Sequence, residues 1–200
     1  YVLWHFEIGV PENLKPPVAG LTGGFLRRMV NSTGYGDNLW QRRGHGLAER
    51  IFAGRTALVT GGGRGLGRAI SRMLAENGAK VAINYQGNEE AARETLDRIE
   101  ADSGEAMLTQ ADVASEQEVE RMIGTIRDCF GRVGLLVNNA GIATSDEHDD
   151  FGFEEWDRMF AVNVDGPFLT TWAVKSEMIA NSFGRNVNIS SLAAHLLKPN

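Results

Sequence analysis

The distribution of apolar and polar residues changes near residue 50, and from Ile51 onward it follows a regular alternation. Short apolar segments, typical of strands buried on both faces, alternate with amphipathic segments whose apolar positions recur every three or four residues. Strands separated by helices of about 12 residues predict an α/β fold with a doubly wound parallel sheet. The predicted strands are 56–60, 80–84, 106–110, 135–137 and 187–189, and the predicted helices are 66–76, 89–101, 115–130, 154–162 and 168–179.

Individual residues mark where some of these helices begin or end. Gly78 follows the helix predicted at 66–76, and glycine is a common stop signal. Ser115 and Glu118 form the S-x-x-E pattern of a capping box, in which each side chain bonds the backbone N–H of the other residue.

Residues 1–50 lack this alternation and are expected to form an irregular N-terminal extension of unknown role. Gly and Pro are frequent, and no helical or strand period persists. Four origins stay open: a targeting extension, the tail of an upstream domain, a non-native upstream translation, or a disordered leader. The first residue is Tyr1, and Met29 is a candidate initiator. The chain therefore divides into this extension and a partial α/β domain at 51–200.

Composition and charge narrow the class of protein. The chain is 42% hydrophobic and 23% charged, which is typical of a globular domain, and no apolar run reaches the roughly 18 residues of a membrane span. Residues 1–50 carry a net charge of +2 and the remainder −8, which argues against nucleic acid as a partner. The single cysteine, Cys129, cannot form an internal disulfide and favours a reducing, cytoplasmic location. Organelle targeting by residues 1–50 stays open.

A glycine-rich turn follows the first predicted strand and leads directly into a helix. In this setting Gly61 permits a tight turn, Gly65 lets the backbone approach a pyrophosphate, and Gly67 permits close packing of helix and strand. The helix N-terminus then offers free N–H groups to an anion. A plain glycine-rich loop is the alternative, and a P-loop is excluded because no Gly-Lys-Ser/Thr follows. The turn reads Thr60-Gly61-Gly62-Gly63-Arg64-Gly65-Leu66-Gly67.

The pattern T-G-x-x-x-G-x-G at 60–67 resembles the cofactor signature of the short-chain dehydrogenase/reductase family, in its single-domain branch. Over about residues 51–198, four further matches follow in the family's order: Asp112-Val113, Asn138-Asn139-Ala140-Gly141, Asn163, and Asn188-Ile189-Ser190-Ser191. The resemblance implies a Rossmann fold that binds a nicotinamide dinucleotide. It is nearest to the 3-oxoacyl-[acyl-carrier-protein] reductases, through Asn84-Tyr85-x-Gly-Asn and Val162-Asn163-Val164. Acetoacetyl-CoA, sugar and sterol reductases remain alternatives.

The resemblance assigns a role to each matched position. Asp112 and Val113 contact the adenine ring, and the Asn-Asn-Ala-Gly segment stabilises the sheet and lies along the cofactor. Ser191 is the catalytic serine that hydrogen-bonds the substrate carbonyl, and the backbone of Asn163 holds a water of the proton relay. The whole cofactor-binding set is Thr60, Gly61, Arg64, Gly65, Leu66, Gly67, Asp112, Val113, Asn139, Ala140 and Gly141.

The strand end at 84–88 bears on which nicotinamide cofactor binds. NAD-selective Rossmann domains place an Asp or Glu about 20 residues past the glycines, where it binds the ribose 2′-OH. Asn84-Tyr85-Gln86-Gly87-Asn88 contains no carboxylate. NADP(H) is therefore favoured over NAD(H), with Arg64 binding the 2′-phosphate. A surface arginine without a phosphate contact is the alternative.

In the resembling family, a catalytic Tyr and a Lys four residues later are expected near position 204, whereas the sequence ends at Asn200. The expectation is an NADP-dependent oxidoreductase that is incomplete at its C-terminus and inactive as written. The parent would transfer a hydride between NADP(H) and a small carbonyl or alcohol substrate as a homo-oligomer, without nucleic-acid or membrane partners. A truncated, inactive dinucleotide-binding or interaction protein is the alternative, and flavin binding is disfavoured by Asn-Asn-Ala-Gly.

Three other features of the sequence are candidates for a functional or structural role. His148 lies in the acidic run 146–150, but no second His or Cys has ligand spacing, so a solvated loop without metal is expected. Cys129 is expected to be a structural residue of the core or the surface. Four aromatic residues recur at helical intervals and predict either core or a helix–helix oligomer surface. They are Trp156, Phe160, Phe168 and Trp172.

Overall fold

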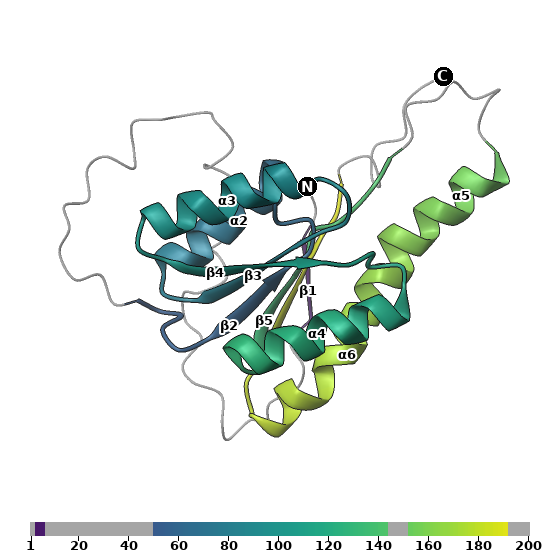
Figure 1. Cartoon of the computed structure of the whole chain (residues 1–200). Coiled ribbons are helices and arrows are strands. Elements are labelled where there is room, and N and C mark those ends of the chain that lie inside the picture. The colour runs from purple at the N-terminus through teal and green to yellow at the C-terminus, as the bar shows by residue number, and fades with distance from the viewer. Residues whose placement is uncertain (1–2, 7–49, 144–151, 192–200) are drawn as a thin grey trace.

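The protein forms a six-stranded sheet with helices on both faces (Figure 1). The structure is a computed structural model that describes residues 3–6, 50–143 and 152–191. The strands are β1 (Leu3–Phe6), β2 (Thr56–Val59), β3 (Lys80–Tyr85), β4 (Glu105–Gln110), β5 (Val133–Asn138) and β6 (Arg185–Ile189). The helices are α2 (Gly65–Glu76), α3 (Glu89–Ala101), α4 (Glu116–Phe130), α5 (Phe153–Phe160) and α6 (Gly166–Ala180), with a π-helical segment η2 (Ala161–Asp165) between the last two.

Strands β2 to β6 are parallel, and the sheet reverses its direction of growth at β2. From β2 the chain adds β3 and β4 on one side, and it then adds β5 and β6 on the other. The doubly wound α/β fold that the alternation predicts is thereby confirmed. The carboxyl ends of β2 and β5 flank the reversal, which is where sheets of this kind form a ligand crevice.

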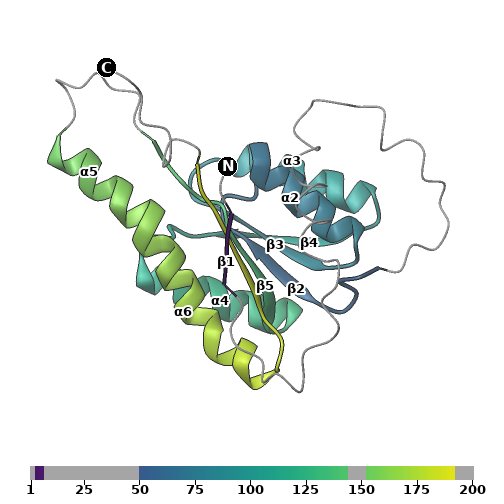
Figure 2. The ribbon, with the colours of Figure 1, turned by 180° about the vertical axis from the view of Figure 1, so that it is seen from behind.

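Helices cover each face of the parallel sheet. Figure 2 shows α2 and α3 on one face, with α4 and α6 on the other. Successive residues of a strand therefore serve two cores: Ala57 and Val59 pack on the side of α2 and α3, and Leu58 packs on the side of α4 and α6. All three are fully buried, which explains why the strands read as continuous apolar runs.

The sequence predicts two separate helices in the C-terminal helical region, whereas the structure has one continuous helical run. α5, η2 and α6 follow one another without interruption (Figure 1). Pro167 has no N–H for the usual helical bond, and the N–H of Gly166 bonds to the carbonyl of Ala161, five residues back. This π-turn keeps the helix continuous through the proline, so the predicted gap at 163–167 is wrong.

One strand lies in the segment that the sequence pattern predicts to be irregular. β1 pairs antiparallel with β6, from Leu3 opposite Ile189 to Phe6 opposite Asn186. An edge strand leaves a row of unpaired N–H and C=O groups, and β1 pairs with that row on β6. The pattern misses this strand because no amphipathic helical segment follows Leu3-Trp4-His5-Phe6 in the sequence, so it stands outside the alternation that marks the other strands. The division of the chain at residue 50 stays a prediction.

Candidate functional site

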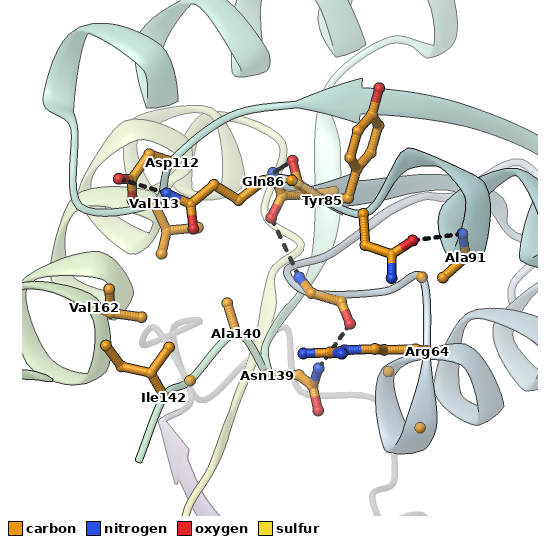
Figure 3. A pocket seen from close by; sticks show the side chains of 18 of the residues that line it. Arg64, Tyr85, Gln86, Ala91, Asp112, Val113, Asn139, Ala140, Ile142 and Val162 are labelled. Atoms are coloured by element: carbon orange, nitrogen blue, oxygen red, sulfur yellow. Dashed lines mark hydrogen bonds between the residues drawn. The ribbon is translucent and has the colours of Figure 1, made fainter. Parts of the chain in front are cut away.

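A cleft of about 480 Å³ opens at the carboxyl ends of β2, β3 and β5, where the sheet reverses (Figure 3). Every residue of the predicted cofactor-binding set lines this cleft except Thr60. Figure 3 shows Arg64 on the opposite side of the cleft from Asp112 and Val113. Four segments that are distant in the sequence meet here: 61–67, 84–88, 111–113 and 139–142.

The turn between β2 and α2 is compact because two of its glycines, Gly61 and Gly67, occupy positions that leave no room for a side chain or disfavour one. Gly61 has a φ of +60°, which side-chain-bearing residues rarely adopt. At Gly67 an added Cβ would overlap the Gly61 carbonyl oxygen and lie 2.7 Å from Asn139 Nδ2. The sequence predicts that Gly67 allows close packing of helix against strand. In the structure, the close contacts at Gly67 are with the turn and with Asn139. As a result, α2 begins directly at the cleft.

The first turn of α2 presents backbone N–H groups at the cleft. Arg64 is the N-cap residue in an extended conformation, and its side chain makes no capping bond. Within the described ranges, the N–H groups of Arg64, Gly65 and Leu66 have no acceptor. Unpaired N–H groups carry the positive end of the helix dipole and attract anions. This edge of the cleft can therefore bind phosphate groups.

Asn84, at the end of β3, is a buried polar residue to which the sequence analysis assigned no structural role. It is 2% exposed. Its Oδ1 accepts a hydrogen bond from the Gly61 N–H at 3.2 Å, and its Nδ2 donates to the Ala111 carbonyl at 3.0 Å. The side chain thus links the glycine-rich turn to the end of β4. An asparagine within the apolar run at 80–85 was the available signal, because a buried amide needs partners.

Hydrogen bonds of Thr60 and Asn139 join the turn after β5 to the turn after β2. Thr60 Oγ1 accepts hydrogen bonds from the N–H groups of Asn139 at 2.9 Å and Ala140 at 3.0 Å. Asn139 Nδ2 donates to the carbonyls of Thr60 at 3.0 Å and Gly61 at 3.1 Å. Thr60 is buried and does not line the cleft, so the structure places it as a support for the residues that do.

Asp112 lies on the side of the cleft where the resemblance expects the adenine ring. Its Oδ2 accepts from Gln86 Nε2 at 3.0 Å, a bond drawn in Figure 3, and pairs with Arg158 of α5 at 2.9 Å. Its N–H donates to Glu118 Oε2 at 2.8 Å. The predicted capping box is therefore only half formed: Ser115 Oγ accepts from the Glu118 N–H at 3.4 Å, while the Glu118 carboxylate turns to Asp112.

A second hollow, of about 380 Å³, adjoins the first and is lined by the predicted catalytic segment. Asn139, Asn163, Asn188 and Ser190 are among its lining residues. In η2, Asn163 accepts through Oδ1 from the Ile142 N–H at 3.0 Å and donates through Nδ2 to the Ile142 carbonyl at 2.9 Å. Its side chain therefore holds the segment after β5 in place. Ser191 follows β6 and is exposed, whereas Ser190 is the serine that lines the hollow.

Asn138 joins β5, β6 and α6 beneath that hollow. Its Nδ2 donates to Asn188 Oδ1 at 2.8 Å, and its Oδ1 accepts from Thr170 Oγ1 at 2.7 Å. Both Asn138 and Thr170 are buried. The first asparagine of Asn-Asn-Ala-Gly thus cross-links the sheet, and the second, Asn139, lines the cleft.

The charged side chains that line the cleft are Arg64 and Asp112. Asp112 is paired with Arg158, whereas Arg64 has no ion-pair partner in the part of the chain that the structure describes. Behind the turn, hydrogen bonds from Arg68 and Arg98 hold the pKa of the Glu94 carboxyl below its ordinary value. The free positive charge at the cleft is therefore that of Arg64.

The remaining predictions concern residues other than those that line the cleft. His148 and its acidic run are outside the described residues, and the residues that are described contain no group of His, Cys, Asp and Glu able to hold a metal ion. Cys129 is exposed, so its surface alternative holds. In the described ranges, no helix combines the length and the apolar content needed to cross a bilayer.

The four aromatic residues of the C-terminal helical region are exposed, so their assignment to the core is wrong. The exposed fractions are 43% for Trp156, 46% for Phe160, 59% for Phe168 and 60% for Trp172. Trp156 stacks on Phe160 with ring centroids 4.2 Å apart, and Phe168 stacks on Trp172 at 5.6 Å. They form an aromatic stripe along α5 and α6.

Residues 55–200 match the family model described as short chain dehydrogenase. A 3-oxoacyl-[acyl-carrier-protein] reductase from Synechocystis sp. is 40% identical over 145 residues, which are 72% of this chain and 59% of that protein. A short-chain type dehydrogenase/reductase from Picea abies is 39% identical over 148 residues, covering 70% of this chain and 55% of the relative. The chain thus spans little more than half the length of these relatives.

Two solved structures also resemble this chain in fold and in sequence. A gluconate 5-dehydrogenase from Burkholderia cenocepacia, in complex with NADP and tartrate, superposes with a TM-score of 0.67 at 37% identity. The match covers 76% of this chain and 59% of that one. A metagenomic short-chain oxidoreductase in complex with NADP gives a TM-score of 0.68 at 34% identity, covering 74% and 66% of the two chains.

Gly67→Ala should destabilise the fold, because its Cβ would meet the Gly61 carbonyl and the Asn139 side chain. Overpacking of this kind costs about 1–3 kcal/mol. Gly87→Ala is the matched control, since no heavy atom lies within 4 Å of a Cβ at that position. Urea unfolding followed by circular dichroism gives the free energy of unfolding of both variants. Equal values would contradict the close approach of α2 to the turn.

Proposed function

Because the chain belongs to the short-chain dehydrogenase family, we propose that its cleft binds NADP(H) and that the protein transfers a hydride to or from a carbonyl or hydroxyl substrate. The observation that carries the proposal is the start of α2, where N–H groups and an Arg64 side chain that have no partner among the described residues adjoin one another at the cleft. Backbone N–H groups and a guanidinium are the donors that phosphate oxygens prefer. The residues present therefore fit a phosphorylated dinucleotide.

The preference for NADP(H) over NAD(H) is supported by the charges at one end of the cleft. The segment 84–88 lines that end together with Arg64, and it contributes no carboxylate to bind a ribose 2′-OH. A 2′-phosphate would meet Arg64 and no carboxylate from the segment 84–88. Both the gluconate 5-dehydrogenase and the metagenomic oxidoreductase hold NADP, which agrees with this assignment.

The remaining cleft residues have separate tasks in the proposal. Asp112 and Val113 border the adenine ring, and Asn139, Ala140 and Gly141 lie along the nicotinamide half. Thr60 acts from beneath by holding the N–H groups of Asn139 and Ala140. Because Asp112 is already bonded to Arg158 and Gln86, the adenine end keeps a fixed shape before the cofactor binds.

Chemistry would take place at the hollow beside the nicotinamide end. NADPH supplies the reducing equivalent when bound. Ser191, two residues after β6 and next to Ser190 of the hollow, would donate a hydrogen bond to the substrate oxygen, and this bond strengthens as negative charge grows there. Asn163 would position the segment after β5 through its two bonds to Ile142, and its backbone would serve the proton relay.

For the substrate, we favour a 3-oxoacyl thioester. The support is the 40% identity to a 3-oxoacyl-[acyl-carrier-protein] reductase and the motifs that the chain shares with that subgroup.

We also place the protein in a reducing, cytoplasmic compartment, because the one cysteine is exposed and free.

We further propose that the protein is a homo-oligomer that pairs through the aromatic stripe on α5 and α6. Large aromatic side chains that are about half exposed and clustered on one face mark a contact surface. The stripe follows a helix of roughly 40 Å, estimated from 1.5 Å of rise per residue. Two copies of one helix face can pair about a two-fold axis, since such an interface is self-complementary.

Arg64→Ala should weaken NADPH binding about tenfold or more, while NADH binding changes less than twofold. The reason is that a charge-assisted hydrogen bond to the 2′-phosphate is lost and no contact to the rest of the cofactor is removed. Fluorescence titration with each dinucleotide measures the two dissociation constants. Arg121→Ala, at a 70% exposed side chain on α4, is the control and should change neither. Equal weakening of both dinucleotides would contradict the assignment of Arg64.

The catalytic part of the proposal is tested by reading the encoding transcript past codon 200. The resemblance predicts an in-frame Tyr near position 204 with a Lys four residues later. The protein that includes them should oxidise NADPH when given a 3-oxoacyl thioester, and Ser191→Ala should lower kcat by about 100-fold. A stop at codon 201 would reject hydride transfer for this product and favour an inactive dinucleotide-binding protein.

Trp172→Glu should convert the oligomer to monomers, because it removes a large apolar ring from the aromatic stripe and would place a carboxylate inside the interface. Size-exclusion chromatography with light scattering measures the mass in solution. Ile51→Glu is the control, since Ile51 is 50% exposed and lies outside the stripe. A monomeric parent protein, or a variant that keeps the parent mass, would reject this surface as the interface.

A further inference from the structure

Arg68, on the first turns of α2, has an unusually complete set of partners. Its Nε donates to Thr95 Oγ1 at 2.8 Å, and its Nη2 pairs with Glu94 Oε2 at 2.7 Å and donates to the Ala91 carbonyl at 3.2 Å. Both nitrogens also reach the carbonyl of Gly63, at 3.3 and 3.2 Å. The side chain is only 21% exposed. Arg68 therefore joins the glycine-rich turn to α3.

The carbonyl of Gly63 is the point on which these bonds converge. Besides Arg68, it accepts from Thr95 Oγ1 at 2.8 Å, and Thr95 is fully buried. An added Cβ at Gly63 would lie 2.8 Å from the Cα of Ala92, so the turn rests directly on α3. The carbonyl is thus fixed toward α3 by three donated hydrogen bonds.

Fixing that carbonyl also fixes the N–H on the other side of the same peptide bond. The described chain contains no cis peptide, and in a trans peptide the N–H of Arg64 points opposite to the carbonyl of Gly63. The N–H of Arg64 is therefore turned away from Thr95. It has no acceptor within the described ranges, and Arg64 lines the cleft beside the segment 84–88. Hydrogen bonds to the carbonyl also polarise the peptide and strengthen its N–H as a donor.

We propose that Arg68 is a positioning residue for cofactor choice: by holding the Gly63 carbonyl against α3, it presents Arg64 to the 2′-phosphate of NADP(H). The inference rests on the proposed function, since it concerns the same cleft. Arg68 does not touch the cofactor in this scheme. It acts through the peptide between Gly63 and Arg64, and it sets both the direction of the Arg64 N–H and the starting point of the Arg64 side chain.

Arg72 offers a matched control for a merely structural role. It lies one turn further along α2 and likewise bridges to α3, pairing with Asp102 at 3.0 Å, while its Nη2 lies 3.8 Å from Glu76. Its side chain is 37% exposed, and it makes no bond to the glycine-rich turn. If Arg68 served only to join α2 to α3, the loss of Arg68 and the loss of Arg72 would have similar consequences.

The experiment measures dissociation constants for NADPH and NADH by fluorescence titration of the whole chain, at a temperature where circular dichroism shows each variant folded. Arg68→Met should reduce the ratio of NADH to NADPH dissociation constants about fivefold to tenfold. Arg72→Met should leave this ratio within twofold of the parent value. Thr95→Val, which removes one donor to the Gly63 carbonyl and no charge, should reduce the ratio about twofold to threefold. Arg68→Lys should recover part of the loss.

Each outcome decides between the alternatives. Equal weakening of NADPH and NADH in Arg68→Met would reject the inference and leave a structural role. An unchanged ratio in Thr95→Val would also reject it, because Arg68 would then act through its charge and not through the peptide. If Arg68→Met does not fold, Thr95→Val and Arg68→Lys carry the test. A parent chain that binds neither dinucleotide rejects the proposed function itself, whereas one that binds both equally rejects the inference and the preference for NADP(H) but leaves dinucleotide binding in place.

Discussion

The close approach of Gly67 to the Gly61 carbonyl is the constraint on which the cleft depends. It lets α2 begin immediately after β2, so that the unpaired N–H groups of its first turn lie at the point where the sheet reverses. With a longer or wider turn, those groups would face solvent away from β5. The same contact brings Asn139 within bonding distance of the turn, at 3.1 Å from the Gly61 carbonyl. The close contact between Gly67 and Gly61 thus keeps the turn after β2 next to the turn after β5, where the two halves of the sheet meet.

Polar side chains at the ends of the strands stabilise this arrangement. Thr60, Asn84 and Asn138 are all buried, where an unsatisfied polar group would cost about 1–3 kcal/mol. Each is instead bonded to a neighbouring strand or turn: Thr60 to the segment after β5, Asn84 to both flanking turns, and Asn138 to β6 and α6. Elsewhere the parallel strands are joined by backbone hydrogen bonds and by apolar packing. These three residues therefore fix the strand ends relative to one another, which gives the cleft a defined shape.

The sequence predicts the strands, most helix positions and the cleft residues, because apolar periodicity and the order of the motifs are local signals. What it misses depends on contacts between distant segments. The π-turn at η2 arises from a bond that Pro167 cannot make, and the Glu118 carboxylate turns to Asp112 and leaves the capping box half formed. β1 stands outside the alternation of strand and helix segments that marks the other strands. The α3 partners of Arg68 lie 23 to 27 residues away, so no spacing rule could identify them.

Arg64 and Arg68 show why residue type alone does not assign a role. They are four positions apart at the start of one helix. Among the described residues, the Arg68 side chain makes five hydrogen bonds to four partners, whereas the Arg64 side chain makes none. A guanidinium bonded to the turn and to α3 stabilises the fold, and one without partners at the mouth of a cleft is available to an anion. The body of the protein carries a net charge of −8, which would repel a polyanion at long range. Binding must therefore depend on a short-range arrangement: oriented N–H groups, one free arginine, and an Asp112 neutralised by Arg158. Because salt screens the general repulsion over about 10 Å and leaves close contacts nearly intact, the local geometry outweighs the overall charge.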